Sequence, residues 1–529
     1  MLQSRQLCLQ ALRANTYLKS HPTQSEPFLQ IQLKERFFVK TVFKKIIHYT
    51  YTNKIWIISA LAIALLLPYN TGYGSIGNAC LTFATLIVAR KSKPALCLLF
   101  ILLTPAILYI PAGHAYGKIN IGHAAALLQT NTSEAIEFIK LNITGFTLCL
   151  MAIIFLSIFI IKSWNSRSKK GHLLFLIVFI LLNLNSYPKR FAIAAYMRLS
   201  EARTEVEILK NGISTKDQFI ILKKNIQYKN ILVIIGESVT REYMSVYGYP
   251  LDTTPWLKNA NGDFYTNVIS PAPNTFLSLP RTLARFDENK KEAANNIVNL
   301  SNKADLNTYW VSNQGRIGEF DTPATIIAHH AKHKFFLNNG DYESAKNSDD
   351  FQMLPYINSI IRNKENKVIF AHMIGSHPNP CERLQSYPLN FNTGNKIIDC
   401  YLSSIQKLDS FIKRATEMLE KNGEPYVIFY FSDHGLTVDN SSNPVRHGNS
   451  YRENYDIPFF IIDKKYNTHR LIDEPFNNAE FLSKFAEKIG IEYKLPLDEM
   501  RNSDYIIYNG ASFIDYRSLP TSKIIGGKM

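Results

Sequence analysis

The sequence predicts an α-helical membrane domain followed by a soluble α/β domain with a mainly parallel sheet. Long apolar runs fall almost entirely within the first 190 of the 529 residues. After about residue 225, short apolar strands alternate with helical patterns, which is typical of a parallel sheet covered on both faces. These patterns predict a basic arm (1–50), a transmembrane domain (51–190) with an outside loop (112–142), a linker (191–225) and a soluble domain (226–529).

Five apolar segments predict five membrane spans, at 55–69, 76–89, 95–111, 143–161 and 173–187. Basic residues gather in the N-terminal arm and in the connections at 90–93 and 162–170, and the positive-inside rule places all three in the cytoplasm. An odd number of spans then puts the soluble domain on the opposite face, which is the periplasm in a bacterium. The net charge of +16 is explained by a membrane surface rather than by nucleic acid, so no nucleic acid partner is expected.

Buried strands are predicted where β-branched and aromatic runs are bounded by polar residues. They lie at 231–235, 308–312, 368–374, 426–432 and 458–462, and the strongest helical pattern between them, 397–422, ends at Gly423. In such sheets the loops that bind ligands gather at the carboxyl ends of the strands. Residues just past these ends are therefore the first candidates for a functional site.

Two strands end in residues that ligate metals. Glu237 follows the first strand, and Asp433 and His434 follow the strand at 426–432. Carboxylate and imidazole are zinc ligands, and parallel strands deliver these side chains to one edge of the sheet. An Asp-His pair alone is more often a turn and a helix cap. A turn rarely needs both residues after so apolar a strand, and metal binding is the favoured interpretation.

A candidate nucleophile lies in the segment SPAPNTFLSLPRTL, where a helix is predicted to begin near Thr275. A hydroxyl there acts most simply as a helix cap. The same position favours a nucleophilic oxygen and phosphate oxygens, because free N–H groups and the helix dipole attract negative charge. Thr275 and Ser278 both qualify by chemistry.

Three histidines lie in or after predicted strands, and the soluble domain also contains two cysteines. His372 and His377 lie in VIFAHMIGSHPNP, and His447 lies 13 residues after His434. Each histidine could bind metal, hold phosphate oxygens or protonate a leaving group. The soluble domain contains two cysteines, Cys381 and Cys400, and a bridge between them is possible in an oxidising compartment.

The motifs GESVTREYMSVYGYPLDTTPWL, TFLSLP, HMIGSH, SDHG and RHG, in this order after the apolar segments, resemble those of the bacterial phosphoethanolamine transferases. These belong to the alkaline phosphatase and sulfatase superfamily. The resemblance implies an alkaline phosphatase-like soluble domain that uses zinc. It implies that Glu237, Thr275, Asp433 and His434 hold the metal, and that Thr275 is the catalytic nucleophile.

The resemblance also implies residues that bind the substrate. The family's substrate-side histidines match His377 and His447, and His372 is a further candidate on the same edge. The Thr and Glu that hold the donor head group match Thr130 and Glu134 in the outside loop, four residues apart on one predicted helical face.

The sequence departs from the family at two points. Ala126 stands where the family has an Asn four residues before the Thr, and the many cysteines of the members that modify lipid A are missing. These departures favour the branch that modifies outer-core sugars or periplasmic glucans.

The implied reaction transfers phosphoethanolamine from phosphatidylethanolamine, through a covalent Thr275 intermediate, to lipopolysaccharide, lipid A or a periplasmic glucan. The protein would then lie in the bacterial inner membrane as a multi-pass protein with its catalytic domain in the periplasm. Three alternatives remain: a phosphoglycerol transferase of the lipoteichoic acid synthase type, a membrane-bound sulfatase that uses Ser278, and a non-catalytic membrane sensor.

Overall fold

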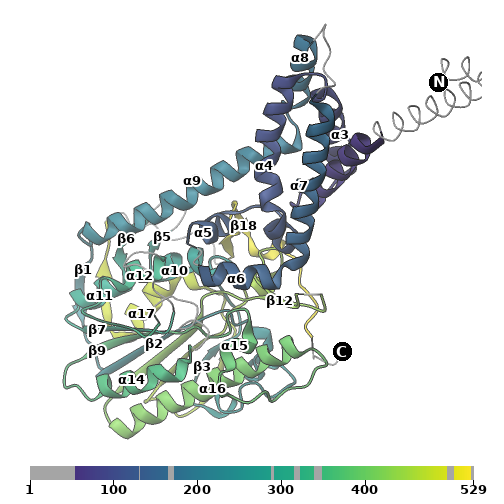
Figure 1. Ribbon diagram of the computed structural model, residues 1–529. Helices are drawn as coiled ribbons and strands as arrows, with labels where there is room; N and C mark the ends of the chain where they lie inside the picture. Colours follow the sequence, from purple (N-terminus) through teal and green to yellow (C-terminus); the bar gives the residue numbers. More distant parts are fainter. Residues whose placement is uncertain are drawn as a thin grey trace, which may run out of the picture.

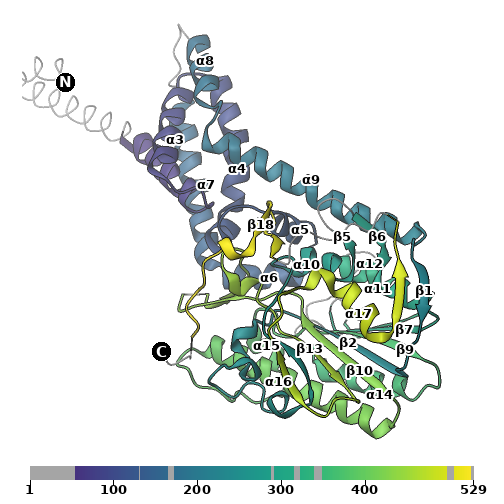
Figure 2. The ribbon, with the colours of Figure 1, turned by 180° about the vertical axis from the view of Figure 1, so that it is seen from behind.

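A helical domain projects from a larger α/β domain, and a long helix, α9 (Tyr187–Ser214), runs from one to the other (Figures 1 and 2). The computed structural model describes residues 54–129, 132–164, 172–286, 291–314, 322–338, 348–441, 443–496 and 505–525. The predicted basic arm, 1–50, lies outside the described residues.

The helical domain contains fewer long spans than the five predicted. Among the described residues, two helices are long and apolar enough to cross a membrane, α4 (Lys93–Tyr116) and α7 (Ile143–Ser163). A third span is present if α8 (His172–Leu182) and α9 count together, although the pair is bent by 59°. The other two predicted spans correspond to shorter apolar helices, Lys54–Tyr69 and α3 (Ile76–Ala89), so five spans are not confirmed.

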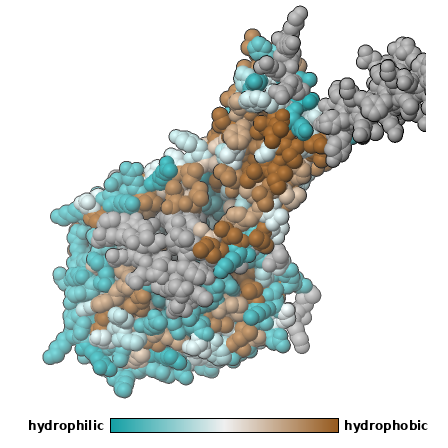
Figure 3. Space-filling view, in the orientation of Figure 1, coloured by the Kyte–Doolittle hydropathy of each residue, from teal (hydrophilic) through white to brown (hydrophobic). Residues whose placement is uncertain are grey.

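Apolar side chains cover the outer surface of this helical domain (Figure 3). Leu98, Phe100, Ile101 and Leu108 of α4 are exposed, as are six apolar residues of α7. A water-soluble domain rarely exposes so large a continuous apolar surface, and lipid contact explains it. The same view shows a mostly hydrophilic surface on the described part of the α/β domain.

Two short helices and one long helix connect the domains. The outside loop contains two helices, α5 (Ile121–Gln129) and α6 (Thr132–Leu141). The predicted fifth span ended at residue 187, but Tyr187 begins α9, with Pro188 in its first turn. The predicted linker is therefore mainly helical and packs along the α/β domain.

The α/β domain is built on an eight-stranded mixed sheet of order β14-β3-β13-β10-β2-β9-β7-β8. All five predicted strands are present, and β13 alone runs against the other strands. The chain leaves β10 at the edge where the candidate metal residues lie and returns to β13 from that same edge, which makes this pair antiparallel. The strands are β2 (Asn230–Gly236), β3 (Gly262–Tyr265), β7 (Asn307–Ser312), β8 (His333–Phe336), β9 (Lys367–His372), β10 (Tyr426–Ser432), β13 (Phe459–Asp463) and β14 (His469–Ile472).

Helices cover both faces of this sheet, which is why β2, β9 and β10 are buried throughout. One face packs against α14 (Met353–Ile361) and α16 (Lys396–Asn422). The predicted end of α16 is correct, because Gly423 adopts a left-handed φ of 82° there. The other face packs against α10 (Thr275–Leu283), α11 (Ile297–Lys303), α12 (Pro323–Ala328) and α17 (Phe481–Ile489).

Smaller elements complete the domain. A disulfide joins Cys381 of α15 (Pro380–Leu384) to Cys400 of α16, with 4.8 Å between the Cα atoms. Two hairpins lie near α9, namely β5 (Ala284–Phe286) with β6 (Lys291–Asn296), and β17 (Ile506–Tyr508) with β18 (Phe513–Asp515).

Candidate active site

Glu237 is buried immediately after β2, and its local backbone is closely packed. A Cβ on Gly236 would lie 2.5 Å from the Tyr430 hydroxyl, so only glycine fits at the end of this strand. Ser238 has a left-handed φ of 62°, which turns the chain sharply. Its Oγ donates to Glu237 Oε1 at 2.5 Å, and its N–H donates to Asp433 Oδ1 at 3.0 Å.

The register of the sheet brings Asp433 and His434 to Glu237. Strands β2 and β10 are parallel neighbours in which Gly236 pairs with Ser432, so the residues that follow each strand lie side by side. His434 Nε2 is 3.4 Å from Glu237 Oε1 and 3.5 Å from Asp433 Oδ2. Among the described residues these three form a group whose ligand atoms lie within 4.8 Å of one another.

Thr275 lies at the first position of α10 and faces the same three residues. Its Oγ1 donates to Glu237 Oε2 at 3.0 Å and is 3.4 Å from His434 Nε2. The Asn274 side chain caps the helix by accepting from the Leu277 N–H at 3.1 Å. The capping role considered for Thr275 is therefore filled by its neighbour, which leaves the Thr275 hydroxyl free to react.

Ser278 lies one turn further into α10, and the structure does not bring it to the metal residues. Its side chain is fully buried, and its Oγ has no hydrogen-bond partner. Of the two hydroxyls that qualified by chemistry, Thr275 is the one whose contacts place it beside Glu237 and His434.

Burial and mutual charge shift the protonation of this group. Burial raises the pKa of Asp433, and the neighbouring Glu237 carboxylate raises it further. Burial also acts to raise the pKa of Glu237, but the hydrogen bond and charge of His434 hold it below its usual range. The pKa of His434 is raised to about 9, since attraction by the two carboxylates outweighs burial. Two buried carboxylates with one histidine thus favour added positive charge.

The donors fit a zinc ion. Asp433 Oδ2 is buried without a hydrogen-bond partner, although an unpaired carboxylate oxygen is costly in the interior of a protein. Two carboxylates, one imidazole and the Thr275 hydroxyl offer the oxygen and nitrogen donors that zinc accepts in four-coordinate sites. The arrangement can therefore hold a metal ion against the hydroxyl.

The predicted histidines divide into two groups. The His447 ring lies 5.1 Å from His434 and 5.5 Å from His377, centroid to centroid, and His447 Nδ1 is buried without a partner. His372 lies behind the site, where its Nδ1 is 3.2 Å from Ser312 Oγ. Burial lowers the pKa of His372 to about 4, so this histidine is neutral at pH 7.

The outside loop reaches the nucleophile helix, but its two predicted substrate residues lie outside the description. Thr130 is not among the described residues, and the Glu134 side chain is not described either. A Cβ on Gly122 of α5 would lie 2.3 Å from Asn274 Nδ2. The membrane domain therefore packs directly against the residue that caps α10.

Sequence patterns missed two residues of the site. Gln314 Nε2 donates to Glu237 Oε2 at 3.2 Å and to the Met373 carbonyl at 2.8 Å, which ties the carboxylate to the β9 loop. Its position two residues past β7, at the same edge of the sheet, was the available signal. Asn274 was the second, since an Asn directly before a predicted helix is a strong cap signal.

Comparisons with known proteins agree with this geometry. The model of the Sulfatase family matches residues 229–491. The chain is 28% identical over 447 residues to phosphoethanolamine transferase OpgE of Escherichia coli K12, covering 78% of this chain and 85% of that protein. It is 23% identical over 358 residues to phosphoethanolamine transferase EptC of the same organism, covering 57% of this chain and 59% of that one.

Two solved structures share the fold. The integral membrane phosphoethanolamine transferase EptA of Neisseria meningitidis superposes with a TM-score of 0.58 at 14% identity, covering 83% of this chain and 96% of that one. The zinc complex of the periplasmic domain of Escherichia coli EptC superposes with a TM-score of 0.50 at 21% identity, covering 59% of this chain and 99% of that one.

Residues 229–491 therefore form a sulfatase-family domain with an alkaline phosphatase-like fold, carried by a chain with apolar helices that could cross a membrane. The resemblance predicted from the order of its motifs is confirmed, because the relatives to which this chain is similar are named phosphoethanolamine transferases.

Proposed function

We propose that this enzyme transfers phosphoethanolamine from phosphatidylethanolamine to a glycan or glycolipid of the bacterial cell envelope through a covalent Thr275 intermediate. One observation carries the proposal: the Thr275 hydroxyl lies at a helix N-terminus, 3.0 Å from Glu237 and 3.4 Å from His434. A nucleophile, a metal-ligand set and a phosphate-binding helix end thus meet at one point. The apolar helices would hold this site at the periplasmic face of the inner membrane.

The first half of the reaction is a displacement at phosphorus. Thr275 Oγ1 forms a bond to phosphorus, the bond from phosphorus to the diacylglycerol oxygen breaks, and the diacylglycerol leaves. The hydroxyl proton moves along the hydrogen bond to Glu237. His377, whose ring lies 5.5 Å from that of His447, donates a proton to the leaving oxygen. Phosphoethanolamine remains on Thr275 as a phosphodiester.

Zinc is the proposed metal, with Glu237, Asp433, His434 and Thr275 as the residues that would hold it. When bound, it would neutralise charge on the nucleophile and on the phosphoryl oxygens. The free N–H groups at the start of α10 would stabilise the same oxygens, because the helix dipole is positive there.

The second half of the reaction reverses the first with a new alcohol. A hydroxyl or phosphate of the acceptor attacks phosphorus from the side that diacylglycerol left, and the bond to Thr275 breaks. Thr275 regains its proton as the acceptor loses one. We propose lipopolysaccharide, lipid A or a periplasmic glucan as the acceptor, with the outer-core or glucan branch favoured by the residues of the outside loop.

Two of the three alternatives are less well supported by the geometry. A sulfatase would need an oxidised Ser278, but that side chain is fully buried and has no hydrogen bond to the metal residues. A phosphoglycerol transferase would use the same nucleophile with a different head group, and the mass of the intermediate separates the two. Within the described residues the metal-ligand set is intact, which argues against a non-catalytic sensor.

The test is the mass of the tryptic peptide 259–281, which contains both Thr275 and Ser278, after incubation of the full chain with phosphatidylethanolamine and no acceptor. We expect a phosphoethanolamine adduct on Thr275. A phosphoglycerol adduct formed only from phosphatidylglycerol, or formylglycine at Ser278, would contradict the proposal. Mass spectrometry of envelope glycans and glycolipids from cells with and without the protein then identifies the acceptor.

A further inference from the structure

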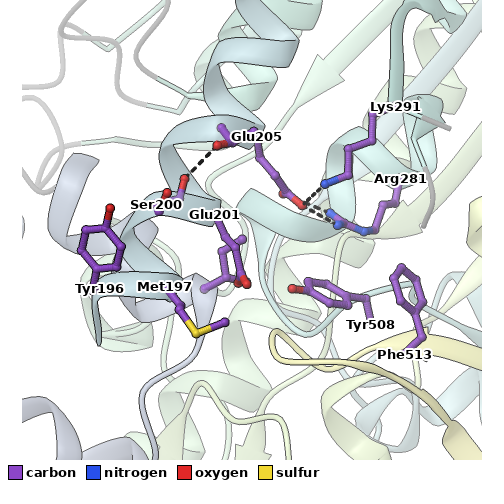
Figure 4. Close-up of a pocket in the computed structure, with 11 residues that line it drawn as sticks. Tyr196, Met197, Ser200, Glu201, Glu205, Arg281, Lys291, Tyr508 and Phe513 are labelled. Atoms are coloured by element: carbon purple, nitrogen blue, oxygen red, sulfur yellow. Dashed lines mark hydrogen bonds and ion pairs between the residues drawn. The ribbon is translucent and has the colours of Figure 1, made fainter. Parts of the chain in front are cut away.

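A second cavity lies beside the nucleophile helix, on the side of α10 that faces α9 and the β17–β18 hairpin (Figure 4). Its volume of about 460 Å³ falls within the range of small-molecule sites. None of the candidate catalytic or metal residues lines it. The lining residues are Ile121, Tyr196, Met197, Ser200, Glu201, Thr204, Glu205, Arg281, Lys291, Tyr508 and Phe513.

This cavity and the active site lie at opposite ends of α10. Thr275 begins the helix and Arg281 lies six residues later, so the two are about 9 Å apart along the helix axis. Between them, Phe276 and Leu277 pack with Ile121 and Tyr508 in one apolar cluster. A ligand in the cavity would therefore be close to the catalytic centre but separate from it.

Along α9 the lining changes from apolar to charged with distance from the membrane helices, whereas Tyr508 and Phe513 form an aromatic wall beside Arg281. Tyr196 and Met197 lie in the part of α9 nearer the membrane helices, and their side chains are 75% and 48% exposed. Glu205, eight residues further along α9, is buried at the charged end of the cavity. This gradient matches an amphiphile whose chains point to the bilayer and whose head group points into the α/β domain.

The charged end is balanced and contains a donor without a partner. Glu205 binds Arg281 Nη2 at 2.8 Å and Lys291 Nζ at 3.4 Å, while Glu201 pairs with Arg198 at 2.6 Å. Arg281 is 3% exposed, and its Nε–H is buried without an acceptor. The residues that line the cavity include two cations, Arg281 and Lys291, and two carboxylates, Glu201 and Glu205, and this equal number suits a zwitterion.

The aromatic residues favour a lipid over a sugar. A glycan site normally presents an open aromatic face. The Tyr508 ring instead lies 4.7 Å from the Arg281 guanidinium and 4.9 Å from the Phe513 ring. Tyr196, the most exposed aromatic residue of the cavity, lies at its membrane end, where tyrosine is typical of a lipid interface.

We propose that this cavity binds the head group of a second phospholipid of the zwitterionic ethanolamine class. The phosphate lies against Arg281 and Lys291, the ammonium lies near Glu201, and the acyl chains pass Tyr196 and Met197 toward the bilayer. The choice of head group rests on the proposed function, since a donor lipid held here is next to the site that consumes it. The cavity itself does not depend on Thr275 chemistry.

The test counts bound lipids on the full chain in detergent by native mass spectrometry, with Thr275→Ala present throughout to prevent turnover. The probe is dihexanoyl phosphatidylethanolamine. Ser200→Trp fills the cavity from an exposed position of α9, and Ser214→Trp at the far end of the same helix is the matched control. We expect the Ser200→Trp chain to bind one lipid fewer than the Ser214→Trp chain.

A second variant leaves the size of the cavity unchanged. Glu201→Gln removes the carboxylate proposed to face the ammonium. We expect this change to weaken binding of the second lipid roughly tenfold. Equal stoichiometry in the two Trp variants, or equal binding of dihexanoyl phosphatidylglycerol, would overturn the proposal. So would a β-linked glucose oligosaccharide that binds to the control and is lost from Ser200→Trp, because that result assigns the cavity to a glycan acceptor.

The proposed function can fail separately. Absence of the Thr275 adduct in the wild-type chain would refute the reaction and leave the lipid count unchanged. A missing second lipid together with a normal adduct would refute only the proposal that the cavity binds a lipid.

Discussion

Two buried acidic clusters lie at opposite ends of α10, and they differ in what neutralises them. Near the Arg281 end, Glu205 is paired with Arg281 and Lys291, so the chain supplies the balancing charge itself. At the Thr275 end, Glu237 and Asp433 share one histidine, and Asp433 Oδ2 has no hydrogen-bond partner. The carboxylate of the first cluster is neutralised by cations of the chain, and this end of the helix suits a zwitterion. The second has excess negative charge and suits a metal cation.

The difference also separates structure from catalysis. Where a buried carboxylate is paired with a guanidinium group, the folded protein loses stability when either partner is removed. Where a buried carboxylate has no such partner, its removal takes a ligand away from the metal site. The stability of the protein then changes only through weaker metal binding. Substitutions in the two clusters should therefore change different measurements.

The largest expected effect is at the nucleophile. Thr275→Ala removes the atom that forms the covalent bond, and we expect the transfer rate to fall by at least about 10³-fold while the fold is retained. Ser278→Ala, one turn further into the helix, should keep most activity, because its Oγ makes no hydrogen bond in the structure. Transfer from phosphatidylethanolamine is the measurement. Activity in the Thr275→Ala chain would show that the nucleophile does not lie at this end of α10.

The second prediction concerns metal content. Asp433→Asn removes one of two anionic ligands, and we expect the purified full chain to lose most of its zinc, measured by elemental analysis. In the wild type, zinc at 100 times its Kd should stabilise the chain by about 2.7 kcal/mol, since only the folded site binds it. Asp439→Asn is the control, because that carboxylate pairs with Arg446 outside the metal group. Equal zinc in both variants would refute the metal site.

The third prediction concerns the balanced cluster. Arg281→Met leaves Glu205 buried with Lys291 as its remaining partner, and we expect a loss of about 3 kcal/mol in the free energy of unfolding. Zinc content should be unchanged. The double variant Glu205→Leu with Arg281→Met should recover most of the loss, because no charge remains unpaired. The midpoint of thermal unfolding in detergent measures the loss in the single variant and the recovery in the double variant.

A fall in zinc content of the Arg281→Met chain would remove the distinction between the two clusters. It would mean that the far end of α10 controls the position of Thr275 and of its metal ligands.

The cluster of candidate metal ligands was predictable from the sequence, whereas the balanced cluster was not. Glu237, Asp433 and His434 each follow a strongly apolar strand, and parallel strands deliver the residues after them to one edge. Glu205 and Arg281 meet only because α9 packs along the α/β domain, a tertiary contact between segments 76 residues apart. No periodic pattern contains that information.

The fold shows the same division. The five strands and the end of α16 at Gly423 follow from local composition and were predicted. The reversed direction of β13 depends on where the loop after β10 returns to the sheet, which strand propensity does not specify. Five membrane spans are not confirmed, because two apolar helices are shorter than a bilayer requires and the last apolar segment bends into α9.

The smallest expected effect tests whether the metal cluster depends on a neutral neighbour. Gln314 donates one hydrogen bond to Glu237 Oε2 and another to the Met373 carbonyl, so it orients the carboxylate without adding charge. Residues that orient metal ligands typically contribute 10- to 100-fold to the affinity for the metal. We therefore expect Gln314→Ala to weaken zinc binding by roughly tenfold. Competition with a chromophoric chelator measures the Kd directly, and Gln314→Asn should recover little because its shorter amide cannot span both acceptors. Gln227→Ala, at an exposed position just before β2 begins, is the matched control. If Gln314→Ala lowers the unfolding midpoint without changing the zinc Kd, Gln314 is structural, and the Glu237 carboxylate is oriented by Ser238, Thr275 and His434.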